Sequence, residues 1–199
     1  MKKTLLKKLT VGLLLAVSAF SLIGCNSNAK SKDSKEKEDK VEKADFETQT
    51  ITLDNVTFEI PKDWSELSIP NAIAGYTSYA PANADINVGT SNVNITVSAQ
   101  TQKMTIKDLN DNRSVFEKQI KSAFSSAEDF KYSDFKAPSG DVFVMEYNYS
   151  ASNKSASISQ YMVLLDGYVA TITATNINDN VSPSAQEVAK YMANTIKVK

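Results

Sequence analysis

The sequence predicts an α+β fold in which helices pack on a central, largely antiparallel sheet, and three features of residues 45–199 predict it. Apolar and polar residues alternate in several short runs, as they do in strands that bury one face. Short polar turns separate the last three of these runs, and such turns connect antiparallel strands. Two further segments carry apolar residues at helical spacing, and an amphipathic helix buries that face against another element.

The first two strands are expected within residues 51–60, where apolar residues alternate on either side of Asp54 and Asn55. This pattern is typical of a β-hairpin. Pro61 ends the second strand because proline has no N–H to donate. The following turn delivers Trp64. We expect its ring in the core, and a ring that stacks on a ligand is the alternative.

A short strand over residues 74–80 and an alternating strand over residues 93–99 precede the first helix. Thr105 and Asp108 resemble a capping box, with Asp in place of Glu, so the helix is expected to start there. It is expected to extend to residue 127 because its apolar residues keep helical spacing up to that point. They are Leu109, Phe116, Ile120, Ala123, Phe124 and Ala127.

Three strands are expected next, over residues 142–149, 155–165 and 168–175, and the last carries a ladder of threonines on one face. Their short polar connections suit hairpins. Pro183 is expected to open a final helix after Ser182, because proline is favoured at the first helical position. The apolar stripe of that helix is Val188, Tyr191, Met192 and Ile196.

The segment Phe58-Glu-Ile-Pro-Lys-Asp-Trp64 resembles the Phe-x-x-Pro-x-x-Trp opening of the PsbP-like superfamily, which includes the bacterial DcrB-like envelope proteins. The order of elements and the ending Gly167-Tyr-Val-Ala-Thr-Ile-Thr173 before a last helix are also similar. The resemblance implies an α/β/α sandwich over residues 51–199 that serves as a binding or assembly module. Because members bind unrelated partners, it implies no functional residues, and the matching Pro61 and Trp64 look structural.

The N-terminus reads as an export signal. Four lysines among the first eight residues precede an uncharged, apolar run over residues 9–23. This run is shorter than the roughly 20 residues of a membrane-spanning helix. It ends in Leu22-Ile23-Gly24-Cys25, which resembles the lipobox of bacterial lipoproteins and contains the only cysteine of the sequence.

The lipobox implies transfer of a diacylglycerol to the Cys25 sulfur, with acyl chains of the palmitate type, and cleavage between Gly24 and Cys25. Two acyl chains suffice for stable anchoring, since each buried CH₂ contributes ~0.8 kcal/mol. The alternative is a chance cysteine at the end of a membrane anchor. We therefore expect a lipoprotein on the extracytoplasmic face of the cell membrane.

Residues 26–44 contain six lysines and five acidic residues. Such a composition cannot bury enough apolar surface to offset the entropy of ordering. The sequence therefore predicts three parts: a signal peptide at 1–24, the lipidated cysteine and a disordered tether at 25–44, and one folded domain at 45–199.

Composition excludes several functions. The sequence has no histidine, which excludes histidine-based triads and histidine metal ligands. Residues 45–199 contain 12 basic and 18 acidic residues, a net charge of −6, whereas nucleic-acid binding needs a basic face. We expect no cofactor.

Two motifs resemble sites of chemistry. The segment Asp108-Leu-Asn110-Asp-Asn112 opens like a calcium loop, but Arg113 replaces the required glycine and Gln119 the bidentate glutamate. Ser133 and Lys136 have the Ser-x-x-Lys spacing of some nucleophilic enzymes, but no glycine elbow precedes the serine. We therefore expect no metal site and no catalytic residues.

Two function hypotheses follow. The first is a non-catalytic envelope lipoprotein that binds a partner protein or assists its assembly. The second is a protein that captures a small ligand or a cation such as calcium, which the acidic domain suggests.

Residues 70–92 are the candidate partner surface, because they include a single charged residue, Asp85. Charge depletion together with tyrosine is typical of interface cores. Tyr76 and Tyr79 are three apart in an expected strand, so they point to opposite faces, one into the core and the other toward a partner. An ordinary surface loop is the alternative. The candidate partner-binding residues are Tyr76, Tyr79, Ile86 and Val88.

Overall fold

The structure, a computed structural model, describes residues 43–68, 76–84, 89–151, 154–177 and 179–199. The signal peptide, Cys25 and nearly all of the tether lie outside these ranges. In chain order the elements are β1 (Thr48–Leu53), β2 (Val56–Pro61), β3 (Trp64–Glu66), β4 (Tyr76–Pro81), β5 (Asn92–Ala99), α2 (Ile106–Asp111), α3 (Arg113–Ala123), β6 (Glu128–Ala137), β7 (Gly140–Ala151), β8 (Lys154–Leu165), β9 (Tyr168–Asn176), α4 (Ala185–Thr195) and β10 (Lys197–Val198).

The main sheet has seven strands in the order β3-β4-β5-β9-β8-β7-β6, and every pair in it is antiparallel. Strands β6 to β9 follow one another as hairpins, and the short polar connections predict the two that join β7, β8 and β9. A second sheet has the order β1-β2-β10 and contains the predicted hairpin around Asp54 and Asn55. The predicted fold class, helices on a largely antiparallel sheet, is confirmed.

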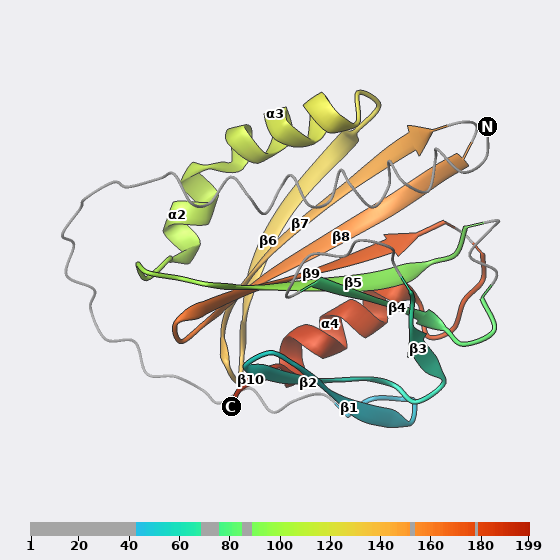
Figure 1. The fold of residues 1–199 in the computed structure, drawn as a ribbon. Coiled ribbons are helices and arrows are strands. Elements are labelled where there is room, and N and C mark those ends of the chain that lie inside the picture. The colour runs from blue at the N-terminus through green and yellow to red at the C-terminus, as the bar shows by residue number, and fades with distance from the viewer. Residues whose placement is uncertain (1–42, 69–75, 85–88, 152–153, 178) are drawn as a thin grey trace.

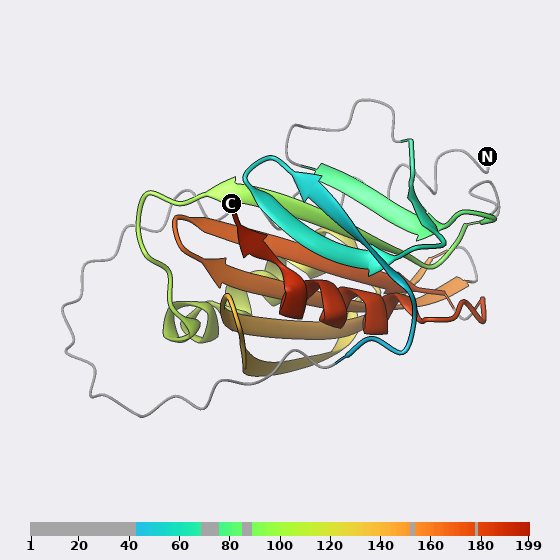
Figure 2. The ribbon, with the colours of Figure 1, turned by 90° about the horizontal axis from the view of Figure 1, so that it is seen from below.

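The two faces of the main sheet are covered by different elements (Figures 1 and 2). Helices α2 and α3 lie over the β6–β8 end of one face, where Leu109, Phe116 and Ile120 pack on apolar residues of β7 and β8. Helix α4 and the small sheet cover the other face, where Val188 and Met192 pack on β5, β8 and β9. The domain is therefore three layers deep with an apolar core on each side of the sheet.

The predicted single helix over residues 105–127 is wrong: it is two helices, and a strand follows them. Thr105 and Asp108 form the predicted capping box on α2. The helix ends after Asp111, and the Asn112 side-chain amide donates to the Asp108 carbonyl at 2.8 Å. Asparagine and aspartate bond to nearby backbone in this way and so compete with a continuous helix.

Strand β6 was not predicted, because its apolar residues change face along the strand. Phe130 and Tyr132 pack into the core beneath α2 and α3, whereas Phe135 and Ala137 pack into the core beneath α4. A register shift between Glu128 and residue 131 also interrupts its pairing with β7. No single alternating pattern survives in such a strand.

The last helix begins two residues later than predicted. Its N-cap is Ser184, whose hydroxyl accepts from the Glu187 backbone N–H while the Glu187 carboxylate accepts from the Ser184 N–H. This reciprocal pair satisfies two donors that have no partner within the helix, so Pro183 precedes the cap. Within the described ranges, no helix has the length and apolar character needed to cross a membrane.

Candidate binding site

A cavity of about 330 Å³ lies where β1 of the small sheet meets β3 and β4 of the main sheet. Consecutive residues of β1 and of β3 line it, although consecutive strand residues point to opposite faces. The cavity therefore lies against the edges of these strands as well as against one face. Its lining includes apolar Ile51, Leu53, Ile60 and Trp64 and polar Gln49, Thr77 and Glu66.

Two buried polar groups line this cavity without a hydrogen-bond partner among the described residues. Trp64 is 2% exposed and its indole N–H is unsatisfied, and Thr77 is 5% exposed with an unsatisfied hydroxyl. Burial raises the pKa of Tyr79, an effect that the neighbouring Thr77 hydroxyl opposes, but the two make no hydrogen bond of normal geometry. An unpaired buried donor costs about 1–3 kcal/mol, so a ligand that supplies an acceptor would recover part of this.

Gln49 holds the two walls of the cavity together. Its side-chain amide donates to the carbonyl of Trp64 at 2.8 Å and contacts the carbonyls of Pro61 and Lys62 at 3.2 and 3.3 Å. An amide NH₂ has two donor hydrogens, so the three carbonyls share them. The contact ties β1 to the turn between β2 and β3 and positions Trp64.

The structure places Tyr76 and Tyr79 on opposite faces of β4, as predicted, since they oppose Thr96 and Val93 of β5. Both are buried, however, at 7% and 3% exposure, so the expectation that one of them is exposed is wrong. Tyr79 packs edge-on against Phe58 with ring centroids 6.0 Å apart. Burial raises the pKa of Tyr76 to about 12, so its hydroxyl stays protonated at neutral pH.

Two of the four candidate partner-binding residues, Ile86 and Val88, lie outside the described residues. The structure therefore leaves their predicted role in partner binding as a prediction. It brings both tyrosines to the lining of the cavity, beside Trp64.

Comparison with solved structures identifies the architecture. Cyanobacterial PsbP (CyanoP) from Synechocystis sp. PCC 6803 is similar with a TM-score of 0.54 at 16% identity, over 90% of this chain and 99% of that one. This chain has the PsbP-like fold. The resemblance seen in the sequence is thus confirmed for the fold.

Two further structures show weaker similarity. LpqN of Mycobacterium tuberculosis, a protein involved in cell envelope biogenesis, matches 78% of this chain and 92% of its own with a TM-score of 0.49 at 16% identity. A protein from Bacteroides thetaiotaomicron VPI-5482 matches 73% of this chain and 45% of its own, with the same TM-score at 12% identity. No protein-family model and no curated protein matches the sequence.

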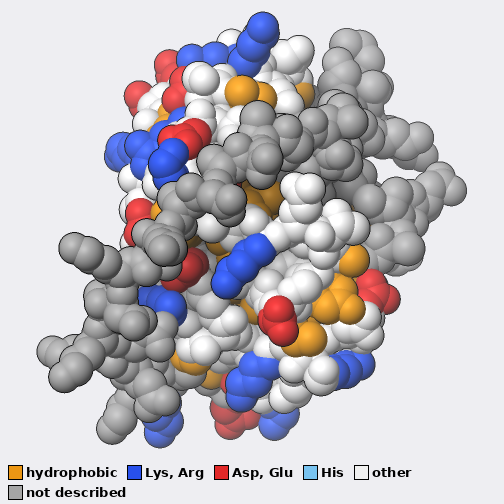
Figure 3. All heavy atoms as spheres, turned by 90° about the vertical axis from the view of Figure 1, so that its left-hand side faces the viewer, with side chains coloured by type: hydrophobic (Ala, Val, Ile, Leu, Met, Phe, Trp, Pro, Cys, Tyr) orange, Lys and Arg blue, Asp and Glu red, His pale blue; other side chains and the backbone are white. Residues whose placement is uncertain are grey.

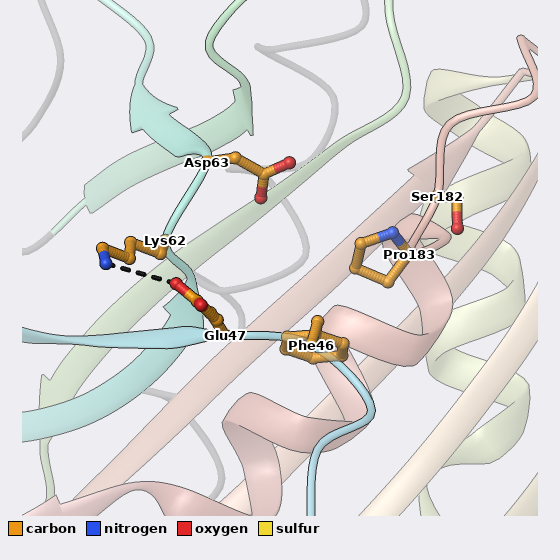
Figure 4. A pocket seen from close by; sticks show the side chains of 6 residues that line it. All are labelled: Phe46, Glu47, Lys62, Asp63, Ser182 and Pro183. Atoms are coloured by element: carbon orange, nitrogen blue, oxygen red, sulfur yellow. Dashed lines mark hydrogen bonds and ion pairs between the residues drawn. The ribbon is translucent and has the colours of Figure 1, made fainter.

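A second hollow of the PsbP-like domain, of about 480 Å³, lies beside the start of β1 and the segment before α4 (Figure 4). Lys62 and Glu47 form an ion pair of 3.2 Å in its wall, with side chains 69% and 82% exposed. Exposed pairs of this kind contribute little to stability. None of the six described lining residues has a buried polar atom without a partner, so this hollow is the weaker candidate.

The predicted absence of a metal site remains a prediction. Among the described residues, no three acidic or cysteine side chains converge in a way that could hold a metal ion. Asp108 is engaged in the helix cap, as expected. Ser133 lies on β6 and is exposed, and Lys136 pairs with Asp141 at 3.5 Å.

The charges of the domain do not gather into one patch on the face seen in Figure 3. Lysine, arginine and acidic side chains are interspersed there, with small separate apolar areas between them. The described side chains of that face therefore form no broad basic surface for a polyanion.

Sequence reasoning missed Gln49 and Thr77 as residues of the site. The signal that could have found Gln49 is its place in a strand of alternating threonines, where it shares the inward face with Ile51 and Leu53. A polar residue on the inward face of such a strand needs an internal partner. Thr77 carries no comparable signal in the sequence.

Proposed function

We propose that this chain is a lipoprotein anchored through Cys25 to the extracytoplasmic face of a bacterial cell membrane. Its PsbP-like domain then acts as a non-catalytic module that binds an envelope partner or assists its assembly. The location rests on Leu22-Ile23-Gly24-Cys25 at the end of a signal-type apolar run. A diacylglycerol on the Cys25 sulfur would supply the two chains that stable anchoring needs.

The binding role is supported by one observation above all, the unsatisfied indole N–H of Trp64 in the lining of an edge cavity. Catalysis is less well supported by the same lining. Glu66 is its one carboxyl group among the described residues, and the tyrosines have raised pKa values. A general acid–base pair needs two groups that exchange a proton near neutral pH.

Capture of a small ligand is the second candidate, because the cavity volume of about 330 Å³ lies within the range of small-molecule sites. Cation capture has less support, since no three acidic side chains converge in the part of the chain that the structure describes.

The anchoring is tested by labelling cells with a radioactive fatty acid and comparing wild type with Cys25→Ala. We expect label and membrane association for wild type only, and an unprocessed precursor for the variant. Label that persists in Cys25→Ala would contradict lipidation at this residue.

The binding role is tested in intact cells with a photo-crosslinking amino acid at Ser65, which is exposed beside the cavity, and at Lys118, which is exposed on α3. We expect a discrete cross-linked protein from position 65 and none from position 118. Failure of position 65 to give a product, or equal products from both, would contradict a binding role for this site.

A further inference from the structure

Strand β1 is an edge of the small sheet, and its hydrogen bonds to β2 leave alternate residues free on the outer side. The carbonyl of Glu47 accepts from the N–H of Lys62 at 2.9 Å, and these residues extend by one step the register in which Thr48 opposes Pro61. Bonded and non-bonded pairs alternate along an antiparallel ladder. The backbone groups that point away from β2 therefore belong to Thr48, Thr50 and Thr52.

Two contacts on the far side of β2 agree with this direction. Glu59 opposes Thr50, and its N–H donates to the Thr195 hydroxyl of α4 at 3.2 Å, away from β1. Thr57 opposes Thr52 and pairs with Lys197 of β10 on its other side. No described strand pairs with the outer edge of β1, so its threonine backbone groups are open to a new strand.

The other sheet edges in the described ranges are shielded from such pairing. Strand β6 carries charged residues along its length, including Lys131, Asp134 and Lys136. Strand β3 has three residues, and the Trp64 carbonyl already accepts from Gln49. Strand β10 has two residues, one of them a lysine. Charges and shortness protect edges against added strands, whereas β1 has six residues and no charge.

The cavity lies beside this open edge. The indole N–H of Trp64 in its lining has no acceptor among the described residues. A segment paired with β1 would have alternate side chains on the face of Ile51 and Leu53, toward apolar walls of the cavity. The other backbone edge of the bound segment would face β3. Carbonyls of the segment on that edge can accept from the indole N–H of Trp64. The space, about 330 Å³, equals that of roughly ten water molecules in the liquid.

The negative charge near the cavity favours some segments over others according to their own charge. Glu66 is exposed and lines the opening, and residues 45–199 have a net charge of −6 from 12 basic and 18 acidic residues. Lys62, which lies on the β2–β3 turn, is paired with Glu47. The complementary segment is uncharged where it meets β1 and basic where it passes Glu66.

We propose that the free edge of β1 and the cavity beside it bind an extended segment of a partner protein, apolar at its centre and carrying a neighbouring lysine or arginine. The segment adds a strand to the small sheet and inserts an apolar side chain beside Trp64. This inference rests on the proposed function, since it names the surface through which the module meets its partner.

The test is a selection of random linear peptides of about ten residues, enough to span the strand, on the full chain purified from membranes in mild detergent. We expect selected peptides to alternate apolar residues and to contain a basic residue. Thr50→Pro removes an outward N–H without removing a bond to β2, and proline is tolerated on edge strands. It should weaken binding at least roughly tenfold, while the matched control Thr50→Val keeps the N–H and the affinity.

A second variant addresses the cavity. Trp64→Phe removes the indole N–H and should weaken the selected peptides roughly tenfold. The proposal is overturned if no peptide is selected, if acidic peptides prevail, or if Thr50→Pro binds as wild type does. Dimerisation of wild type that Thr50→Pro abolishes would also overturn it, because a second copy would then be the occupant.

Hydrogen exchange in the wild type gives a measurement that does not depend on a variant folding. Peptide binding should slow exchange at the amides of Thr50 and Thr52 and leave Ser133 on the β6 edge unchanged. Unchanged rates at both threonines would overturn the proposal. If cross-links from position 65 persisted in cells with Thr50→Pro, the β1 edge would not be the binding surface. The proposed binding role would still stand.

Discussion

The carboxylate of Asp179 accepts two hydrogen bonds from Ser91, one from the hydroxyl at 2.5 Å and one from the backbone N–H at 2.6 Å. The Ser91 hydroxyl in turn accepts from the N–H of Ile177 at 3.1 Å. Strands β5 and β9 are paired from Asn92 and Thr175 onward. The Asp179–Ser91 contact thus joins the chain just before β5 to the chain just after β9, beyond the end of their ladder.

Because of this contact, we expect the free energy of unfolding to decrease as the pH falls into the acid range. Burial alone would raise the pKa of Asp179, but hydrogen bonds from Ser91, from its own backbone N–H and from Thr90 together outweigh it, and the net pKa is lowered. A carboxyl group with a lowered folded-state pKa stabilises the fold above its unfolded pKa of roughly 4 and loses this as pH falls. We expect Asp179→Asn to cost about 1 kcal/mol at pH 7, since solvent screens the exposed side chain.

The measurement for Asp179→Asn is urea unfolding at pH 7 and at successively lower pH. The difference from wild type should shrink progressively as the pH falls from the unfolded pKa through the lowered folded pKa, because folded Asp179 then becomes neutral, as asparagine is. A difference that stays constant across this range would show that ionisation of Asp179 plays no part. The Glu187 carboxyl, whose pKa the Ser184 hydroxyl lowers, is present in both proteins and cancels.

Replacement of Gln49 tests whether it holds the cavity walls together. Gln49→Leu removes the donors that face the carbonyls of Pro61, Lys62 and Trp64 and should cost about 1–2 kcal/mol of unfolding free energy. Gln49→Glu should cost more at neutral pH, because an ionised carboxylate offers no donor and faces carbonyl oxygens. The extra cost should shrink in acid, where a protonated carboxyl can donate. Equal free energies of unfolding for the two variants would show that the Gln49 amide does not hold the cavity walls together.

The sequence predicts regular elements well and contacts between elements poorly. The hairpins of β7, β8 and β9 were predicted because each strand has apolar residues at strand spacing and short polar turns separate the strands. Strand β6 was missed because it contributes Phe130 to one core and Phe135 to the other. The polar face expected for β5 also proved to be buried, with Asn94 7% and Thr96 8% exposed. Burial of a polar face depends on what packs over it, which periodicity does not reveal.

In the candidate site too, the sequence predicts the position of a single residue but not the contacts between elements. The core position of Trp64 was predicted, since a lone tryptophan after a strand that ends in proline is usually buried. The cavity beside it depends on the approach of β1 to β3 and β4, which belong to different sheets. No local pattern encodes that approach.

Phe116 and Phe124 should differ in their contribution to stability, although the sequence placed both in one apolar stripe. Phe116 is 4% exposed and packs against Phe143 with ring centroids 6.3 Å apart. Phe124 is partly buried at the C-cap of α3, against Tyr149 at 4.8 Å. We expect Phe116→Ala to cost about 3–5 kcal/mol and Phe124→Ala about 1–2 kcal/mol. Equal losses in urea unfolding would show that the two rings are buried alike.

Gly140 begins β7 and Gly167 lies in the turn between β8 and β9, and the two should tolerate alanine differently. A Cβ on Gly140 would lie 2.0 Å from the Leu164 carbonyl oxygen, a backbone atom of the paired strand β8. Gly167 has φ of +71° and open space around its Cβ position. We expect Gly140→Ala to cost about 3 kcal/mol, because the ladder must shift, and Gly167→Ala about 1–2 kcal/mol from the left-handed backbone alone. Urea unfolding of both variants measures the order, and a larger loss for Gly167→Ala would mean that β7 and β8 lie farther apart at this turn.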